Sequence, residues 1–308
     1  MKKSLMNKNV LLMLTAMSGL LSASSASAKL NVVTTLTDLR AIAGEVGGDM
    51  ISVDSIAKGT QDPHYIEAKP SFMVKASRAD LMISIGLDLE IGWLPSILNG
   101  ARNPKIMTGS QGYLEVGPLV NPLEVITGNV TRSEGDVHPF GNPHVTLDPI
   151  RCGEIAVAIA ERMGKLDPPH AAKFMQNAKA LQARMAEKTK LWQARITKSG
   201  ITKVVSYHKT LTYFFDRFHL ENPAILEPKP GIPPTSGHII DVINLMKEQN
   251  VRLILVENYF DPTVTNKIKQ ELPSVRAVTT PVAVDGAAQI KTIDDLFENL
   301  VSEIDKKS

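Results

Sequence analysis

Short apolar runs alternate with helical patterns in the first half of the chain. Residues 30–34, 50–53 and 81–85 are brief and strongly apolar, which is typical of buried strands. After the first run, apolar residues recur at helical spacing from Leu36 to Val46 and stop at Gly47-Gly48, a favourable helix end. The pattern predicts strands that alternate with helices.

The same alternation returns after residue 200. Apolar runs predict strands near residues 203–207, 224–226, 252–256 and 275–279. Helical spacing predicts helices over residues 210–218, 237–249, 263–271 and 293–304. Alternating β and α units favour mostly parallel sheets flanked by helices. The predicted fold class is therefore α/β, with two lobes.

One long helical pattern separates the lobes. It begins at Asp167-Pro168-Pro169, an N-cap followed by prolines suited to a first turn, and stops at Ser199-Gly200. Its apolar positions recur every three, four or seven residues: Phe174, Ala178, Leu181, Met185, Trp192 and Ile196. Some 30 helical residues would measure roughly 45 Å. We expect one rigid helix over residues 167–199 to join an N-terminal lobe (29–166) to a C-terminal lobe (200–308), each lobe having its own core.

The first 28 residues have the three parts of a signal peptide. Lysines at positions 2, 3 and 8 precede an apolar run that ends at Leu20-Leu21, and Ala26-Ser27-Ala28 supplies a small-residue cleavage site. We expect cleavage near Ala28 and export to the periplasm. No later segment approaches the ~20 apolar residues of a transmembrane helix.

Charge and cysteine content exclude several classes of function. The chain has 34 Lys and Arg against 32 Asp and Glu. Without the three lysines of the signal peptide the balance becomes 31 against 32, a net charge of −1, which leaves no basic surface for nucleic acid. A single cysteine excludes an internal disulfide and a Cys-rich zinc site.

Three of the seven histidines occupy restricted positions at the predicted edges of the lobes. His64 follows Asp62-Pro63, His144 follows Asn142-Pro143, and His208 follows the strand predicted over residues 203–207. Ligands of open α/β sheets bind beyond the carboxyl ends of strands. We predict that these imidazoles meet in a pocket between the lobes.

The other four histidines have simpler interpretations. His138 is close to His144 and could reach the same region, although a surface loop is the simpler expectation. His170 and His238 are expected to face solvent, and His219 to complement the end of a helix.

Two acidic residues near these histidines need interpretation. Asp148 precedes Pro149 and is expected to cap a helix. Glu257 directly follows the apolar run 252–256, so its carboxylate is expected to face the cleft or to be paired. It could be a fourth metal ligand, a structural ion pair or, the favoured interpretation, a partner that holds an imidazole.

The chain resembles the family of periplasmic zinc- and manganese-binding proteins that deliver ions to ABC importers, the cluster A-I solute-binding proteins. The resemblance covers residues 30–304. Its motifs are Asp62-Pro63-His64 with Lys69-Pro70-Ser71, His138-Pro139-Phe140-Gly141-Asn142-Pro143-His144 with Leu147-Asp148-Pro149, Tyr207-His208 with Tyr213-Phe214 and Phe218, and Val256-Glu257-Asn258. The resemblance implies two α/β lobes joined by a rigid helix, with His64, His144 and His208 as metal ligands between the lobes.

The family's usual fourth metal ligand has no counterpart at the matching position of this chain. It is an acidic residue after the strand that contains Val278, where this chain has Thr279-Thr280-Pro281-Val282. Water, Glu257 and Asp285 remain the candidates, in that order. Three neutral imidazoles suit Zn²⁺, whereas Mn²⁺ prefers more oxygen ligands, and manganese members of the family have a carboxylate where this chain has His208. Zinc is therefore favoured over manganese.

The predicted function is zinc capture in the periplasm and delivery to the membrane permease of an ABC transporter, by a monomer with no catalytic activity. One alternative is a zinc hydrolase or hydratase, because three histidines and a bound water also describe a catalytic centre, with Glu257 as the general base. No His-Glu-x-x-His motif supports this reading. The remaining alternatives are a manganese- or iron-binding member of the same family and a metal-buffering adhesin.

Overall fold

A computed structural model describes residues 29–128, 137–229 and 231–306. The predicted signal peptide, residues 1–28, lies outside the described residues. Within the described part of the chain, no helix combines the length and the apolar character that crossing a membrane requires.

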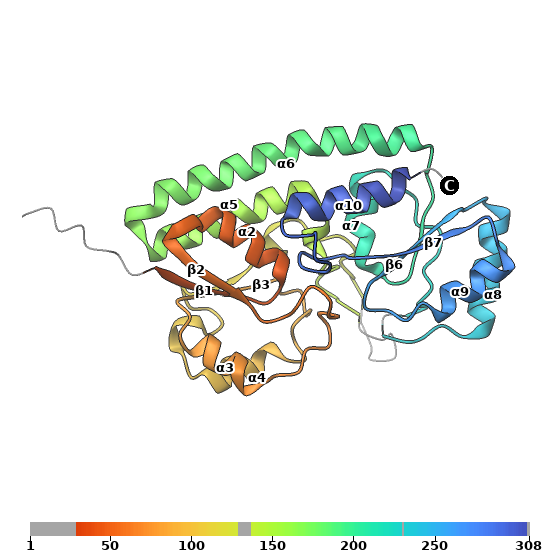
Figure 1. Ribbon diagram of the computed structural model, residues 1–308. Coiled ribbons are helices and arrows are strands. Elements are labelled where there is room, and N and C mark those ends of the chain that lie inside the picture. Colours follow the sequence, from red (N-terminus) through yellow and green to blue (C-terminus); the bar gives the residue numbers. More distant parts are fainter. Residues whose placement is uncertain (1–28, 129–136, 230, 307–308) are drawn as a thin grey trace, which may run out of the picture.

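The first half of the chain forms a four-stranded parallel sheet. Its strands are β1 (Leu30–Thr34), β2 (Ile51–Ser55), β3 (Leu81–Ser84) and β4 (Tyr113–Glu115), in the order β2-β1-β3-β4. Alternate residues of β1 face opposite sides: Val32 packs with the residues of α2 (Thr37–Gly47), and Val33 packs with those of α3 (Pro70–Ser77) and α4 (Leu94–Ala101). Helices thus cover both faces (Figure 1).

The second sheet is smaller and also parallel. It contains β5 (Val205–Ser206), β6 (Leu253–Glu257) and β7 (Arg276–Thr280) in that order. The helices of this part are α7 (Thr212–Arg217), α8 (Ser236–Glu248), α9 (Thr263–Glu271) and α10 (Ile293–Asp305). Short 3-10 helices lie at Gly48–Met50, Pro104–Ile106, Gly117–Leu119, Val145–Leu147, Pro168–His170 and Lys209–Leu211.

The strand predicted over residues 224–226 is reduced to a single bridge between Ser206 and Ile225. Two backbone hydrogen bonds accompany it, from the Leu226 amide to the Ser206 carbonyl and from the Glu227 amide to the Tyr207 carbonyl, each 2.9 Å. Prolines at positions 223 and 228 flank the segment and cannot donate to a ladder, which limits the pairing.

The long helix is present as α6 (Ala171–Ser199), 29 residues that follow the 3-10 turn Pro168–His170. The six predicted apolar positions are its six buried residues. Helix α5 (Pro149–Leu166) packs alongside, and Gly153 permits the approach, because a Cβ atom there would lie 2.9 Å from the Gln182 backbone. Two parallel sheets flanked by helices, together with a long helix, confirm the predicted α/β fold class.

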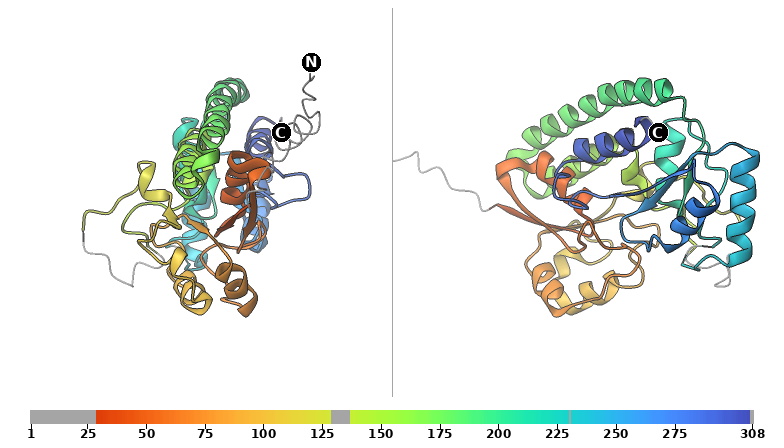
Figure 2. Two further views of the ribbon diagram at one scale, coloured as in Figure 1. Left: turned by 90° about the vertical axis from the view of Figure 1, so that its left-hand side faces the viewer. Right: turned by 45° about the vertical axis from the view of Figure 1, so that its right-hand side comes forward.

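The largest hydrophobic core crosses the predicted domain boundaries. It includes Val32 of β1, Met185 of α6 and Leu255 of β6 in one continuous cluster. Figures 1 and 2 show α10 returning along α6 and α2, and the rings of Trp192 and Phe297 lie 5.5 Å apart across the α6–α10 contact. Two smaller clusters each lie within one predicted lobe, one around Val33 and Ile97 and the other around Val205 and Ile254, so each lobe does have a core of its own. The largest cluster is nevertheless shared, because the C-terminal helix packs against α6 and α2.

Candidate metal centre

His64, His144 and His208 come from three loops that follow regular elements. His64 lies in the loop between β2 and α3, and His144 immediately precedes the 3-10 turn Val145–Leu147. His208 lies between β5 and the 3-10 turn Lys209–Leu211. Two of the three therefore follow the carboxyl end of a parallel strand, one from each sheet, as predicted.

The structure brings these three histidines together. Each offers one ring nitrogen, and the three nitrogens lie within 4.8 Å of one another. The ring centroids are 5.3 Å apart for His64 and His144, 5.4 Å for His64 and His208, and 5.5 Å for His144 and His208. The Nε2 atoms of His64 and His144 are buried, and neither atom has a hydrogen-bond partner within the described residues. Buried polar atoms are normally paired, so this arrangement suits a ligand that the nitrogens share.

Carboxylates contact the Nδ1 atoms of two of the three imidazole rings. The Nδ1 atom of His64 lies 2.7 Å from Asp62 Oδ1, and the Nδ1 atom of His208 lies 2.5 Å from Glu227 Oε2. Because a carboxylate accepts, each Nδ1 carries the proton, and each Nε2 is left with a lone pair for a metal. The hydrogen bond with His64 lowers the pKa of Asp62, although burial alone would raise it.

Glu227 was not identified from the sequence. The short bridge at Ile225 sets its backbone beside Tyr207, and the Glu227 side chain then reaches His208. Its second oxygen accepts a hydrogen bond of 2.9 Å from the Gly231 amide, so the carboxylate links the ring to the following loop. The available signal was a carboxylate directly after a short apolar run, the same signal that drew attention to Glu257.

Asn142 connects the His144 loop to the loop that carries His208. Its Oδ1 accepts a hydrogen bond of 3.0 Å from the His144 amide, and its Nδ2 donates to the Lys209 carbonyl, also at 3.0 Å. The Tyr213 hydroxyl donates to the Asn142 carbonyl at 2.6 Å. These contacts fix the loop beside His208.

The electrostatics of the group favour neutral imidazoles. Burial lowers the pKa of His144 well below its usual value, and the neighbouring His64, His208 and His138 lower it further. A metal binds neutral imidazole only, so this depressed pKa removes proton competition at one of the three rings.

His138 lies closer to the group than a surface loop would suggest. Its ring centroid is 5.3 Å from that of His64, and its Nδ1 is 3.0 Å from the Leu87 carbonyl. The three-histidine cluster, however, does not include it.

Among the other histidines, His170 contacts Asp167, and His219 is exposed after α7. His238 contacts the Ile225 carbonyl and is half-buried, whereas exposure to solvent was expected.

The acidic candidates lie outside the cluster. Asp148 caps α5 through the Ile150 amide, as expected, and also pairs with Arg217. The Asp285 carboxylate pairs with Arg40 at 2.5 Å and with Lys291 at 2.9 Å.

Glu257 is fully buried at the end of β6, and neither of its oxygens has a hydrogen-bond partner within the described residues. The carboxylate that contacts the His208 ring is that of Glu227. A role for Glu257 toward the metal therefore stays a prediction.

Burial raises the pKa of Glu257 from an ordinary 4.5 to about 8. The folded state therefore retains this proton to higher pH than the unfolded state does, and its stabilising effect is fully present below pH 4.5 and lost as pH rises toward 8. Metal-free protein should lose stability over that interval relative to Glu257→Gln, by at most ~1.4 kcal/mol per pH unit. Urea titrations of both proteins at several pH values measure this difference, and parallel curves would contradict it.

A protein family and several known proteins are similar to this chain. Residues 32–306 match the family described as "Zinc-uptake complex component A periplasmic". A putative metal-binding protein of Treponema pallidum is 26% identical over 257 residues, covering 82% of this chain and 79% of that protein. The zinc-binding lipoprotein AdcA of Streptococcus pneumoniae is 22% identical over 258 residues, covering 83% of this chain but only 51% of its own length.

A relative named for manganese has a sequence identity to this chain as high as that of the metal-binding protein of Treponema pallidum. The manganese ABC transporter substrate-binding lipoprotein scaA of Streptococcus gordonii is 26% identical over 246 residues, which is 78% of this chain and 76% of that protein. A crystal structure of ZnuA shares the fold with a TM-score of 0.74, at 20% identity over 90% of this chain and 98% of the other. Since the family match spans almost all of the chain after residue 31, this protein belongs to the periplasmic zinc-uptake component A family.

Proposed function

We propose that this protein captures Zn²⁺ between its two lobes and delivers it to the membrane permease of an ABC importer. The chain belongs to a family of transport proteins. The observation that supports a metal as its cargo is the convergence of three histidine nitrogens within 4.8 Å. His64, His144 and His208 would ligate the ion, and a water or a carboxylate would complete the tetrahedral set that zinc prefers. The protein would act in the periplasm after removal of residues 1–28, as a monomer.

The ligand chemistry supports zinc over manganese. Each of the three converging side chains is an imidazole, and no carboxylate within the described residues joins the cluster. Mn²⁺ favours oxygen ligands and lies at the weak end of the affinity order for divalent ions. Two of the imidazoles are backed by the carboxylates of Asp62 and Glu227, which increases their basicity and orients them.

A competition titration tests the metal assignment. Protein stripped with a chelator is titrated with zinc in the presence of a chromophoric chelator, and then with manganese at the same concentrations. We expect zinc to bind far more tightly. Equal or tighter binding of manganese would contradict the proposal.

A genetic experiment tests the transport role. A strain that lacks the gene should grow poorly in zinc-depleted medium, and the wild-type gene should restore growth. A gene that encodes His208→Ala should not. Full growth of the deletion strain in that medium would favour a metal buffer or adhesin. Hydrolysis of simple esters or peptides that depends on His208 would favour the zinc hydrolase instead.

Removal of the Glu227 charge should weaken zinc binding without removing a ligand. Substitutions of such outer partners cost roughly 10–100-fold in metal affinity, and Glu227→Gln keeps the size of the side chain, so we expect a loss of about tenfold. Glu221→Gln is the matched control, because Glu221 is exposed and pairs with Lys203. A titration in which both variants bind zinc like the wild type would show that Glu227 does not support His208.

A further inference from the structure

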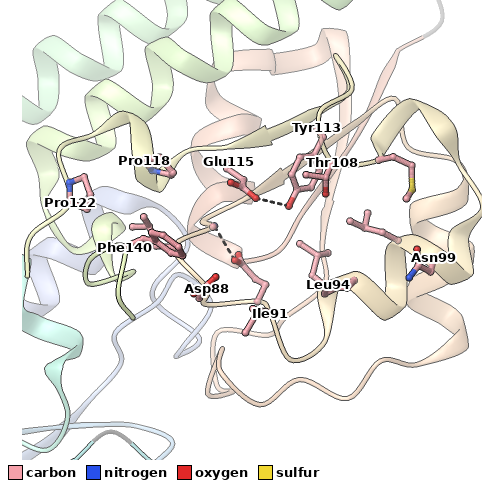
Figure 3. Close-up of a pocket in the computed structure, with 16 residues that line it drawn as sticks. Asp88, Ile91, Leu94, Asn99, Thr108, Tyr113, Glu115, Pro118, Pro122 and Phe140 are labelled. Carbon is pink, nitrogen blue, oxygen red and sulfur yellow. Dashed lines mark hydrogen bonds between the residues drawn. The ribbon is translucent and has the colours of Figure 1, made fainter. Parts of the chain in front are cut away.

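A second cavity lies in the N-terminal lobe. Its volume is about 590 Å³, within the range of roughly 300–1,000 Å³ that is usual for small-molecule sites. The walls come from α4, from β4 and from the segments beside them (Figure 3). His64, His144 and His208 are not among the described residues that line it. The cavity is therefore distinct from the candidate metal centre.

Most of the cavity wall is apolar. Its lining includes Leu94 and Leu98 of α4 together with Ile91, Pro118 and Phe140. Ile91 is 67% exposed and Phe140 is 61% exposed. A single exposed apolar side chain is ordinary, but two large ones in the lining of one apolar cavity favour a ligand with an apolar body.

The charges in this cavity are all negative. Asp88, Glu90 and Glu115 line it, whereas no Lys, Arg or His is among its described lining residues. The Glu90 carboxylate is already satisfied, because it accepts hydrogen bonds from the Ile85 amide at 2.8 Å, the Gly86 amide at 3.0 Å and the Thr35 hydroxyl at 2.7 Å. Asp88 and Glu115 are the carboxylates that remain available to a ligand.

Neither available carboxylate is neutralised. The Asp88 side chain forms no hydrogen bond or ion pair with another described residue, and Glu115 accepts only the Tyr113 hydroxyl, at 3.1 Å. Figure 3 shows both side chains among the residues that line the cavity, with Phe140 and Ile91 near Asp88. An anion would be repelled by this pair, and a neutral molecule would gain nothing from its charge.

The turn that carries Asp88 has an uncommon backbone conformation. Gly86, Leu87 and Asp88 are three consecutive residues in the left-handed region, with φ of 74°, 54° and 65°. Two non-glycine residues rarely adopt this conformation in succession, and the Glu90 hydrogen bond to the Gly86 amide holds the turn. A Cβ atom at Gly86 would lie 3.1 Å from the Glu115 carboxyl carbon, so the glycine also lets Glu115 pack against the turn.

We propose that this cavity binds a small organic cation with an apolar body, of the arylalkylamine class, whose amine is protonated at neutral pH. The ammonium group pairs with the unneutralised negative charge that Asp88 and Glu115 give to the lining. The body packs against Ile91 and Leu94, and the rings of Tyr113 and Phe140 offer faces for a cation–π contact. A bare metal ion fits poorly, because apolar carbon forms most of the wall.

Three probes that share a phenyl ring and carry a positive, no or a negative charge test the proposal. Benzylammonium, benzyl alcohol and benzoate are titrated calorimetrically into chelator-treated, otherwise intact protein. We expect benzylammonium to bind about tenfold more tightly than the other two, the size of one charge-assisted contact. Similar affinities for the three probes, or no benzylammonium binding at millimolar concentration, would overturn the proposal.

Variants localise that binding. The double variant Asp88→Asn/Glu115→Gln keeps side-chain size, and asparagine tolerates the left-handed backbone at position 88. It should lose the preference for benzylammonium while its zinc affinity stays unchanged. Glu187→Gln, at an exposed position of α6, is the control and should retain the preference. If the double variant also retains it, the ligand binds elsewhere; loss of the preference in His64→Ala instead would place it at the histidine group.

Discussion

Replacing His208 by alanine should reduce zinc affinity by more than about 100-fold. The ring contributes one of three converging nitrogens, and loss of an outer partner alone costs up to about 100-fold. The same result is expected for His64→Ala and His144→Ala. Competition titration against a chromophoric chelator measures the three affinities.

A histidine outside the cluster provides the control for these variants. His219 is exposed and has a left-handed backbone, with φ of 54°. His219→Asn preserves that conformation, because asparagine tolerates it, and should bind zinc like the wild type. If one of the three cluster variants also binds like the wild type, that histidine is not a ligand. Circular dichroism spectra should show that each variant is folded.

The second large effect is a loss of folding stability when Phe297 is replaced by alanine. Phe297 is completely buried on α10, and its ring lies 5.5 Å from that of Trp192 on α6. Phe297→Ala should lower the free energy of unfolding by about 3–5 kcal/mol, since it removes apolar contacts and leaves a cavity. Total stabilities are about 5–15 kcal/mol, so the loss would be a large fraction of the whole.

The same variant tests whether the core is shared. Because the largest cluster connects β1, α6 and α10, Phe297→Ala should speed hydrogen exchange in β1 as well as in α10. Leu191→Ala, at a position on α6 that is 62% exposed, is the control and should change stability by less than about 0.5 kcal/mol. Unchanged exchange in β1 would mean that the first lobe is stable on its own.

The sequence predicted the regular elements well because their periodicity is local. The six apolar positions of α6 repeat at helical spacing, and all six are buried. The segment at Ile225 was harder to predict, since a run of three residues between prolines forms only one bridge. The shared core was not predictable from periodicity, because nothing in the α10 pattern specifies the helix against which it packs.

At the candidate site, the sequence identified the histidines but not their supporting partners. His64, His144 and His208 follow strands or prolines, which are local signals. Glu227 is 19 residues from His208 and reaches it only through the register at Ile225. The position of Asp285, held by Arg40 from α2, likewise depends on long-range packing that local patterns do not reveal.

Crystallography of the zinc-loaded protein, with anomalous scattering collected at the zinc absorption edge, tests the central claim most directly. The account predicts one strong peak bonded to a ring nitrogen of His64, His144 and His208, each at about 2.0–2.1 Å. A zinc ion bound elsewhere, or bound without one of these three imidazoles, would contradict it.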